Sequence, residues 1–272
     1  MPAEARRGGC VTVFIATAAI CHRFKGVPFL ESIVRKSHCN RICDTMYKIE
    51  HSAVTFRPFS VFVLVFIMFY AVHGSDCGFV IARLKYDGGG DWYANPSSLP
   101  NLVEAVRLRT AIPICDSIAT ITIDDNDLFR HPFLYMTGHG DVRFSEQQRI
   151  RLRKYLIGGG FLWADDNYGM DRTFRREMEA IFPQNPLTIL PADHPIYRSV
   201  HTLPGLPKIH EHDGGPAEGY GIIFDNRLVV FYSFSSDIGD GMENLEVHND
   251  GPELHELSLN MGVNIVSWFF SP

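Results

Sequence analysis

The sequence lacks the long apolar runs of a multi-span membrane protein. It also has little cysteine beyond its first 74 residues. Residues 59–72 form an apolar run of 14 residues without a charge, whereas a membrane-spanning helix needs about 20. With 46% hydrophobic and 21% charged residues, the 272-residue chain is neither a disordered polymer nor a collagen-like repeat. These absences indicate an ordinary globular protein without a disulfide-rich scaffold.

Several catalytic signatures are also absent. The chain has no G-x-x-x-x-G-K-[ST], which excludes a P-loop, and no G-x-S-x-G, which excludes the serine elbow of many hydrolases. No G-x-G-x-x-G opens a helix after a strand, so dinucleotide binding is unsupported. Neither Cys77 nor Cys115 lies in a glycine-flanked turn after a strand, where a nucleophilic cysteine would be presented.

Charge is unevenly distributed along the chain. Residues 1–74 hold nine Lys or Arg and four Asp or Glu, whereas residues 75–272 hold 16 and 27. A basic head on an acidic body is typical of a targeting segment followed by an exported domain. The acidic body argues against a nucleic-acid partner, because contact with phosphates needs a basic face.

The run of residues 59–72 predicts a signal-peptide core, because small residues follow it. Val72 and Gly74 suit a cleavage site, which would release residues 75–272 as a single domain; the alternative is an uncleaved membrane anchor. We therefore expect an exported protein, periplasmic or anchored to the outer face of the inner membrane. In that environment Cys77 and Cys115 could pair.

A signal peptide belongs at the start of a chain, yet 45 residues precede Met46. Residues 46–74 form a complete signal or anchor, so residues 1–45 are interpreted as an upstream mis-start or a disordered extension. The competing interpretation takes residues 10–21 as the signal core, but it leaves the second apolar run unexplained.

The remaining residues alternate between apolar strand-like runs and segments with helical spacing, which predicts an α/β fold with a mainly parallel sheet covered on both faces. Ser145 and Gln148 form a capping-box pattern at the start of one helix, and Gly158 ends it. Predicted strands are 79–84, 118–123, 133–136, 161–164 and 228–234; predicted helices are 99–109, 145–157, 173–181 and 257–270.

Ligands of such sheets bind at the carboxyl ends of the strands, and here those ends are rich in Gly, Asp, His and aromatic residues. We expect a ligand to be bound by Asp91, Trp92, His139, Asp141, Asp165, Asp166 and Tyr168, with His139 and Asp165 as the candidate catalytic residues. The competing structural interpretation takes residues 88–90 as a turn only, Trp92 as a cap on the core, and Asp165 and Asp166 as helix caps.

A possible metal site lies further along the chain. His210 and His212 are two residues apart, so on a strand they would share one face. With an Asp or Glu from elsewhere, they could hold a divalent metal ion as a cofactor.

Five segments together resemble the bacterial DUF4159 domain family: ARLKY with GGDWY (82–93), SLPNL (98–102), LYMTGHG (134–140), GGFLWADD (159–166) and HEHDGG (210–215). The resemblance covers about residues 78–270. It implies a flavodoxin-like three-layer sandwich related to class I glutamine amidotransferase domains, in a membrane-linked protein. It also implies possible partners, because members are often encoded near MoxR-type AAA ATPases and von Willebrand factor A proteins.

The same resemblance excludes glutaminase activity, because residues 137–140 (TGHG) stand where the amidotransferase fold presents its cysteine. The leading hypothesis is a binding domain for a polar small molecule or an envelope protein. The alternatives are a metal-assisted hydrolase, in which Asp165 or His139 would act as base, and a structural component of an envelope complex.

Overall fold

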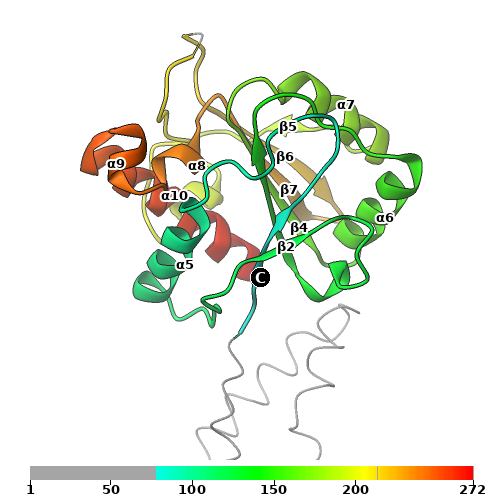
Figure 1. Cartoon of the computed structure of the whole chain (residues 1–272), viewed down its shortest axis with the longest axis horizontal. Helices are drawn as coiled ribbons and strands as arrows, with labels where there is room; N and C mark the ends of the chain where they lie inside the picture. Colours follow the sequence, from blue (N-terminus) through cyan, green and yellow to red (C-terminus); the bar gives the residue numbers. More distant parts are fainter. Residues whose placement is uncertain (1–77, 213, 272) are drawn as a thin grey trace, which may run out of the picture. The chain divides into compact units, whose positions relative to one another are not determined.

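The computed structural model describes residues 78–212 and 214–271 (Figure 1). They belong to one compact unit, Cys77–Pro272. The extension of residues 1–45 and the signal or anchor of residues 46–74 lie outside the described residues, so both stay predictions. Within the described part of the chain, no helix is long and apolar enough to cross a membrane.

A seven-stranded sheet with the order β2-β1-β3-β4-β7-β6-β5 forms the centre of the domain. The first five strands in this order run parallel, and β6 and β5 add an antiparallel edge. The order reverses between β1 and β3, as in flavodoxin-like sheets, which confirms the predicted mainly parallel α/β fold. The strands are β1 Ile81–Leu84, β2 Ala119–Ile121, β3 Phe133–Gly138, β4 Phe161–Asp166, β5 Thr188–Ile189, β6 Glu218–Phe224 and β7 Arg227–Phe234.

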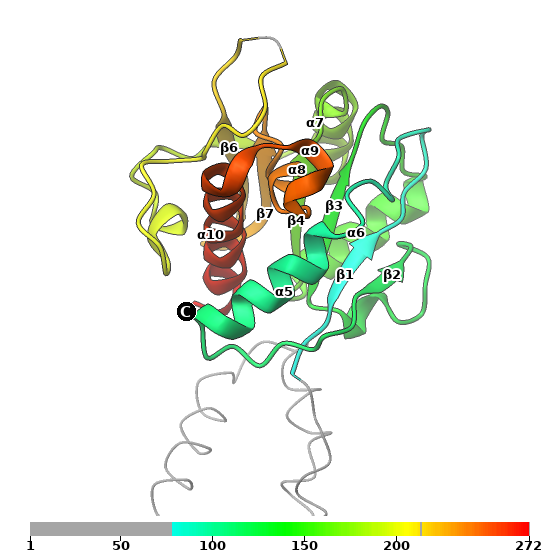
Figure 2. The same cartoon turned by 60° about the vertical axis from the view of Figure 1, so that its left-hand side comes forward.

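The helices cover both faces of the sheet, which completes the three layers (Figure 2). One face is covered by α5 and α10, and the other by α6 and α7, each pair with its own cluster of buried apolar side chains. Two short helices, α8 and α9, follow β7. The bounds are α5 Ser98–Arg109, α6 Glu146–Ile157, α7 Asp171–Ile181, α8 Ile238–Gly241, α9 Leu245–His248 and α10 Gly251–Phe270, with 3-10 turns at Leu128–Arg130 and Pro195–Arg198.

The predicted capping box at the start of α6 is confirmed. Ser145 accepts a hydrogen bond from the backbone of Gln148, and the Gln148 side chain accepts one from the backbone of Ser145. Gly158 follows the last helical residue. Local sequence therefore defines both ends of this helix.

The central strands bring their polar ends side by side. β3 and β4 are buried along their whole length, because helices pack on both faces. Their register pairs Thr137 with Asp165, and β4 in turn pairs Asp165 with Ser233 of β7. Residues that follow β3, β4 and β7 consequently meet at one edge, where the functional site must be sought.

Candidate metal centre

The turn after β7 carries two aspartates to the carboxyl edge of the sheet. Ser235 (φ 53°) and Asp237 (φ 62°) both adopt the left-handed conformation, which is rare outside glycine and clusters at functional sites. The chain then enters α8. As a result, Asp237 and Asp240 both reach the same imidazole nitrogen, Nδ1 of His210.

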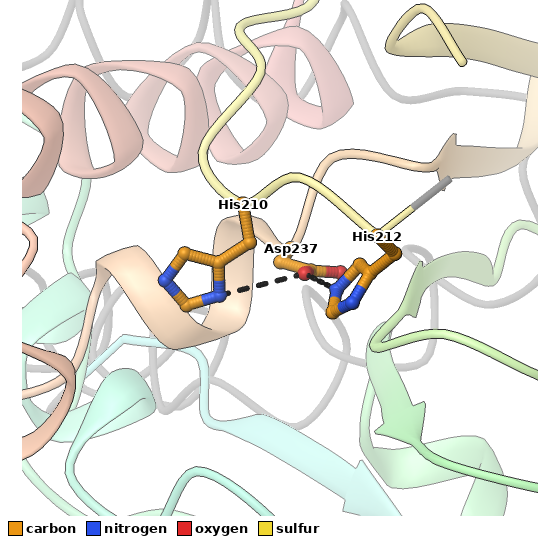
Figure 3. Close-up of side chains that lie close together, drawn as sticks. All are labelled: His210, His212 and Asp237. Carbon is orange, nitrogen blue, oxygen red and sulfur yellow. Dashed lines mark hydrogen bonds and ion pairs between the residues drawn. The ribbon is translucent and has the colours of Figure 1, made fainter. Parts of the chain in front are cut away.

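His210 and His212 lie in the coil that precedes β6, not in a strand. The coil is fastened to the turn after β7, because the backbone N of Ile209 donates to the carbonyl of Ser236 at 3.0 Å. His212 Nε2 is hydrogen-bonded to Asp237. Figure 3 shows the Asp237 carboxylate between the two imidazoles, so both histidines meet at one carboxylate without a shared strand face.

Two histidines are held in the same way, with one ring nitrogen facing inward and the other fixed from outside. His210 Nδ1 lies 3.2 Å from Asp240 Oδ2, and His248 Nδ1 lies 3.8 Å from the same oxygen. On the outer side, His210 Nε2 lies 2.6 Å from Asp250 Oδ1, and His248 Nε2 lies 3.3 Å from Glu243 Oε2. A carboxylate on the outer nitrogen is the usual support of metal-binding histidines.

Two overlapping groups could hold a metal ion: His210, His212 and Asp237, and His210, Asp240 and His248. In each group the ligand atoms lie within 4.8 Å of one another. Ligands of one tetrahedral ion lie roughly 3.3–3.6 Å apart, so the 3.2 and 3.8 Å separations at Asp240 Oδ2 fit a shared ion after small movements. Imidazole nitrogens with carboxylates suit Zn²⁺ or Mn²⁺ better than Mg²⁺ or Ca²⁺.

Two buried amides hold the Asp240 carboxylate in place. Nδ2 of Asn95, just before α5, donates to Asp240 Oδ1 at 2.7 Å, and Nδ2 of Asn167, just after β4, donates to the same oxygen at 2.8 Å. Asn167 in turn accepts a hydrogen bond from Thr137 at the end of β3. This network fixes Oδ1 and leaves Oδ2 directed at the histidines.

The pKa shifts at this centre show that its carboxylates strongly favour a nearby positive charge. Hydrogen bonds to Asp237 and then Asp240 raise the pKa of His210 to about 11. Burial on its own would raise the pKa of Asp240, but the hydrogen bond from His210 and the charge of His248 lower it. The carboxylates therefore favour a cation between them, either a proton on His210 or a metal ion.

One carboxylate oxygen of the centre lacks a partner. Asp237 is fully buried, and its Oδ1 accepts no hydrogen bond from any described residue. Leaving a buried charged acceptor unsatisfied costs more than the roughly 1–3 kcal/mol typical of a neutral group. A bound cation would compensate this oxygen.

Asp165, a candidate catalytic residue from the sequence, lies behind the centre. It is fully buried; Ser233 Oγ donates to its Oδ1, and the backbone N of Gly239 donates to its Oδ2 at 2.6 Å. Burial raises the pKa of Asp165 to about 8. The side chain positions the turn between β7 and α8, and the structure does not place it in either metal group.

His139, the other candidate, pairs with Asp91 at the end of β3. Asp91 Oδ1 accepts a hydrogen bond from the backbone N of His139, and Asp91 Oδ2 lies 3.1 Å from the ring Nδ1. The His139 side chain is 53% exposed. His139 belongs to neither metal group.

Tyr168 joins the metal centre. Its ring stacks on His212 with the ring centroids 4.7 Å apart, and the residue is 53% exposed. Its backbone has φ 82°, which is unusual for a bulky residue.

The other predicted ligand residues belong to neither metal group. Trp92 packs against the core and lies beneath the Lys85 ammonium, 5.3 Å from the ring centroid. Asp141 is exposed and faces Arg172 at 3.9 Å. Asp166 accepts a hydrogen bond from the backbone at the start of α7, which agrees with the structural interpretation of this residue.

The sequence prediction missed several residues of the centre: Asp237, Asp240, Glu243, His248, Asp250 and Asn95. Their only local signals are the D-x-x-D spacing of residues 237–240 and the HND triplet of residues 248–250. Neither pattern has the spacing of a known ligand motif, so only the fold reveals that they converge.

Comparison with known protein families gives a match over the described domain. The family model described as Domain of unknown function (DUF4159) matches residues 80–270. This range contains the whole sheet and every residue of the candidate metal centre. No curated protein matches the chain.

Proposed function

We propose that this chain, which belongs to the DUF4159 family, binds one divalent transition-metal ion and through it a polar ligand. The observation that carries the proposal is the shared geometry of His210 and His248. Each directs one nitrogen at Asp240 and rests the other on a separate carboxylate. Imidazoles with both ring nitrogens engaged in this way are expected around a metal ion. The carboxylate on the outer nitrogen fixes the tautomer that leaves the inner nitrogen free for the metal.

A polar ligand would complete the coordination. Metal centres that keep an open position bind water or substrate there, whereas purely structural centres are closed by four protein ligands. The exposed ring of Tyr168, stacked on His212, offers a flat surface beside such a position. Sugars and other polar molecules with an apolar face fit this combination of ring and carboxylates.

Metal analysis of the purified full-length chain tests the proposal. After equilibration with Zn²⁺ or Mn²⁺ and removal of free ion, we expect one bound ion per chain. His210→Ala removes a ligand common to both groups, so we expect affinity to fall at least about 100-fold, as loss of even an outer partner costs 10–100-fold. A bound ion also stabilises the fold, by about 2.7 kcal/mol at 100 times its Kd.

His131→Ala is the matched control. His131 is a half-buried loop histidine like His210, and the hydrogen bond from Tyr155 reaches its backbone carbonyl, not its ring. This variant should bind metal as the wild type does. A wild-type chain that takes up no ion and gains no thermal stability from either metal would overturn the proposed function.

We also propose that the domain is exported. The uncharged run of residues 59–72 supports this, and Cys115 is disulfide-bonded, as is common outside the cytosol. Cys77, its partner in the sequence-based prediction, lies outside the described residues. N-terminal sequencing of the protein from the cell envelope should read from Ser75 after cleavage, and a chain that still begins upstream of residue 59 would indicate an anchor instead.

A further inference from the structure

We propose that the domain hydrolyses an uncharged acyl ester or amide, with His139 as the general base and Asp91 as the residue that orients it. This inference rests on the proposed metal centre, which would bind and polarise the acyl carbonyl. It assigns a role to a polar pair that metal binding alone does not use.

The pairing fixes which nitrogen of His139 is free. Asp91 uses Oδ1 for the backbone N of His139 and Oδ2 for the ring Nδ1, at 3.1 Å. A carboxylate only accepts, so in the neutral imidazole Nδ1 carries the proton and Nε2 keeps its lone pair. With 53% of the His139 side chain exposed, against 34% for Asp91, the unpaired nitrogen is open to a ligand.

Only glycine fits at residue 138, on the strand side of this pair. Gly138 has φ 139°, and a Cβ there would lie 2.5 Å from Tyr86 Oη and 2.9 Å from Asp91 Oδ1. The loops after β1 and β3 are also joined, because the backbone N of Asp91 donates to the carbonyl of His139 at 3.2 Å. The pair is therefore held rigidly before any ligand binds, as an acid–base group requires.

The loop after β4 connects this pair to the metal centre. On one side the Tyr168 ring stacks on His212. On the other side, a Cβ on the next residue, Gly169, would lie 3.5 Å from the backbone N of Gly140, which follows His139. Since β4 lies between β3 and β7, the ends of β3 and β7 are about 10 Å apart, two strand spacings, and their side chains can address one small molecule.

Charge selects the class of substrate. Asp237, Asp240, Glu243 and Asp250 surround the histidines, and a divalent ion neutralises only part of their negative charge. A phosphate ester or a carboxylate ligand would be repelled by the excess. A neutral carbonyl is not repelled, so an acyl ester or amide fits this centre best.

The reaction balances with water as the only co-reactant. His139 Nε2 takes a proton from water while the water oxygen forms a bond to the acyl carbon. Collapse of the tetrahedral intermediate breaks the bond from carbon to the leaving oxygen or nitrogen. The protonated imidazole then returns its proton to the leaving group, which regenerates the base and releases acid plus alcohol or amine.

The test uses p-nitrophenyl acetate, p-nitroacetanilide and p-nitrophenyl phosphate with the full-length chain, metal-loaded and metal-free. We expect metal-dependent hydrolysis of an acyl probe and none of the phosphate. His139→Gln should lower kcat/KM at least about 100-fold, the usual contribution of a general base, with unchanged metal content. Asp91→Asn should lower it less and displace the pH profile, because the tautomer of His139 is no longer fixed.

The outcomes separate the two proposals. Hydrolysis by surface imidazoles is independent of metal, so the metal-free wild-type chain measures it. If metal binds but no acyl probe is hydrolysed in a metal-dependent way, or if His139→Gln retains the wild-type rate, the hydrolase proposal is overturned and metal binding stands. If the wild-type chain binds no metal, both proposals fall.

Discussion

Gly239→Ala should lower the free energy of unfolding by about 2 kcal/mol, the middle of the range for overpacking a buried site, and weaken metal binding strongly. A Cβ at residue 239 would lie 2.5 Å from Tyr135 Oη, 2.6 Å from Asn95 Nδ2 and 3.0 Å from Asp165 Oδ2. Asn95 is one of the two donors to Asp240. Displacing Asn95 removes a hydrogen bond from Asp240, the carboxylate that His210 and His248 share. A single added methyl group should therefore lower both stability and metal affinity.

Chemical denaturation and metal titration of the same variant measure the two effects. Gly89→Ala is the control, since a Cβ there meets nothing within 4 Å although its φ is 97°. That variant carries only the left-handed backbone penalty of roughly 1–2 kcal/mol and should keep full metal affinity. Equal metal binding by Gly239→Ala and the wild type would show that Asn95 does not position Asp240.

Asp165→Asn should flatten the dependence of stability on pH. Burial raises the pKa of Asp165 from 3.8 to about 8, so between these values the native state holds a proton that the unfolded chain has released. Stability from this group is therefore present at acidic pH and is lost as pH rises towards 8. The upper bound is about 4 kcal/mol between pH 5 and pH 8, at ~1.4 kcal/mol for each pH unit.

Urea denaturation of metal-free protein at several pH values measures this effect. The wild type should lose stability between pH 5 and pH 8, and the variant should lose less. Parallel curves for the two proteins would mean that Asp165 is already ionised at acidic pH.

The parallel part of the fold could be predicted from sequence because its strands are buried on both faces and appear as short apolar runs. The antiparallel edge could not. Strand β6 carries Gly219 and Gly221, which weaken a strand pattern. Neighbouring side chains fill the space that a side chain at these positions would need, since a Cβ on Gly219 would collide with Tyr197 Oη. The turn to β7 is Asp225-Asn226, both left-handed, without the glycine that usually marks such a hairpin.

The site was predictable where its residues follow a predicted strand or share a short spacing, as His210 and His212 do. His139, Asp165 and Tyr168 come directly after β3 or at the end of β4, so topology alone places them at the carboxyl edge. Asp240 and His248 lie in short helices after β7, for which periodicity gives no signal. Their distances to His210 are set by the turn after β7, whose left-handed residues cannot be recognised from sequence.

The contact of His210 with Asp250 has a topological consequence. It joins residues 40 positions apart, and the chain between them contains the whole β6–β7 hairpin. A metal ion on His210 and Asp240 would close nearly the same loop as a non-covalent cross-link. A covalent cross-link over 40 residues would restrict the unfolded chain by about 4 kcal/mol in the chain-entropy model, whereas a metal ion that leaves on unfolding holds the loop only in the folded chain. Loss of the ion would therefore loosen the coil that carries His210 from the short helices after β7, while β7 stays paired with β4 in the parallel sheet.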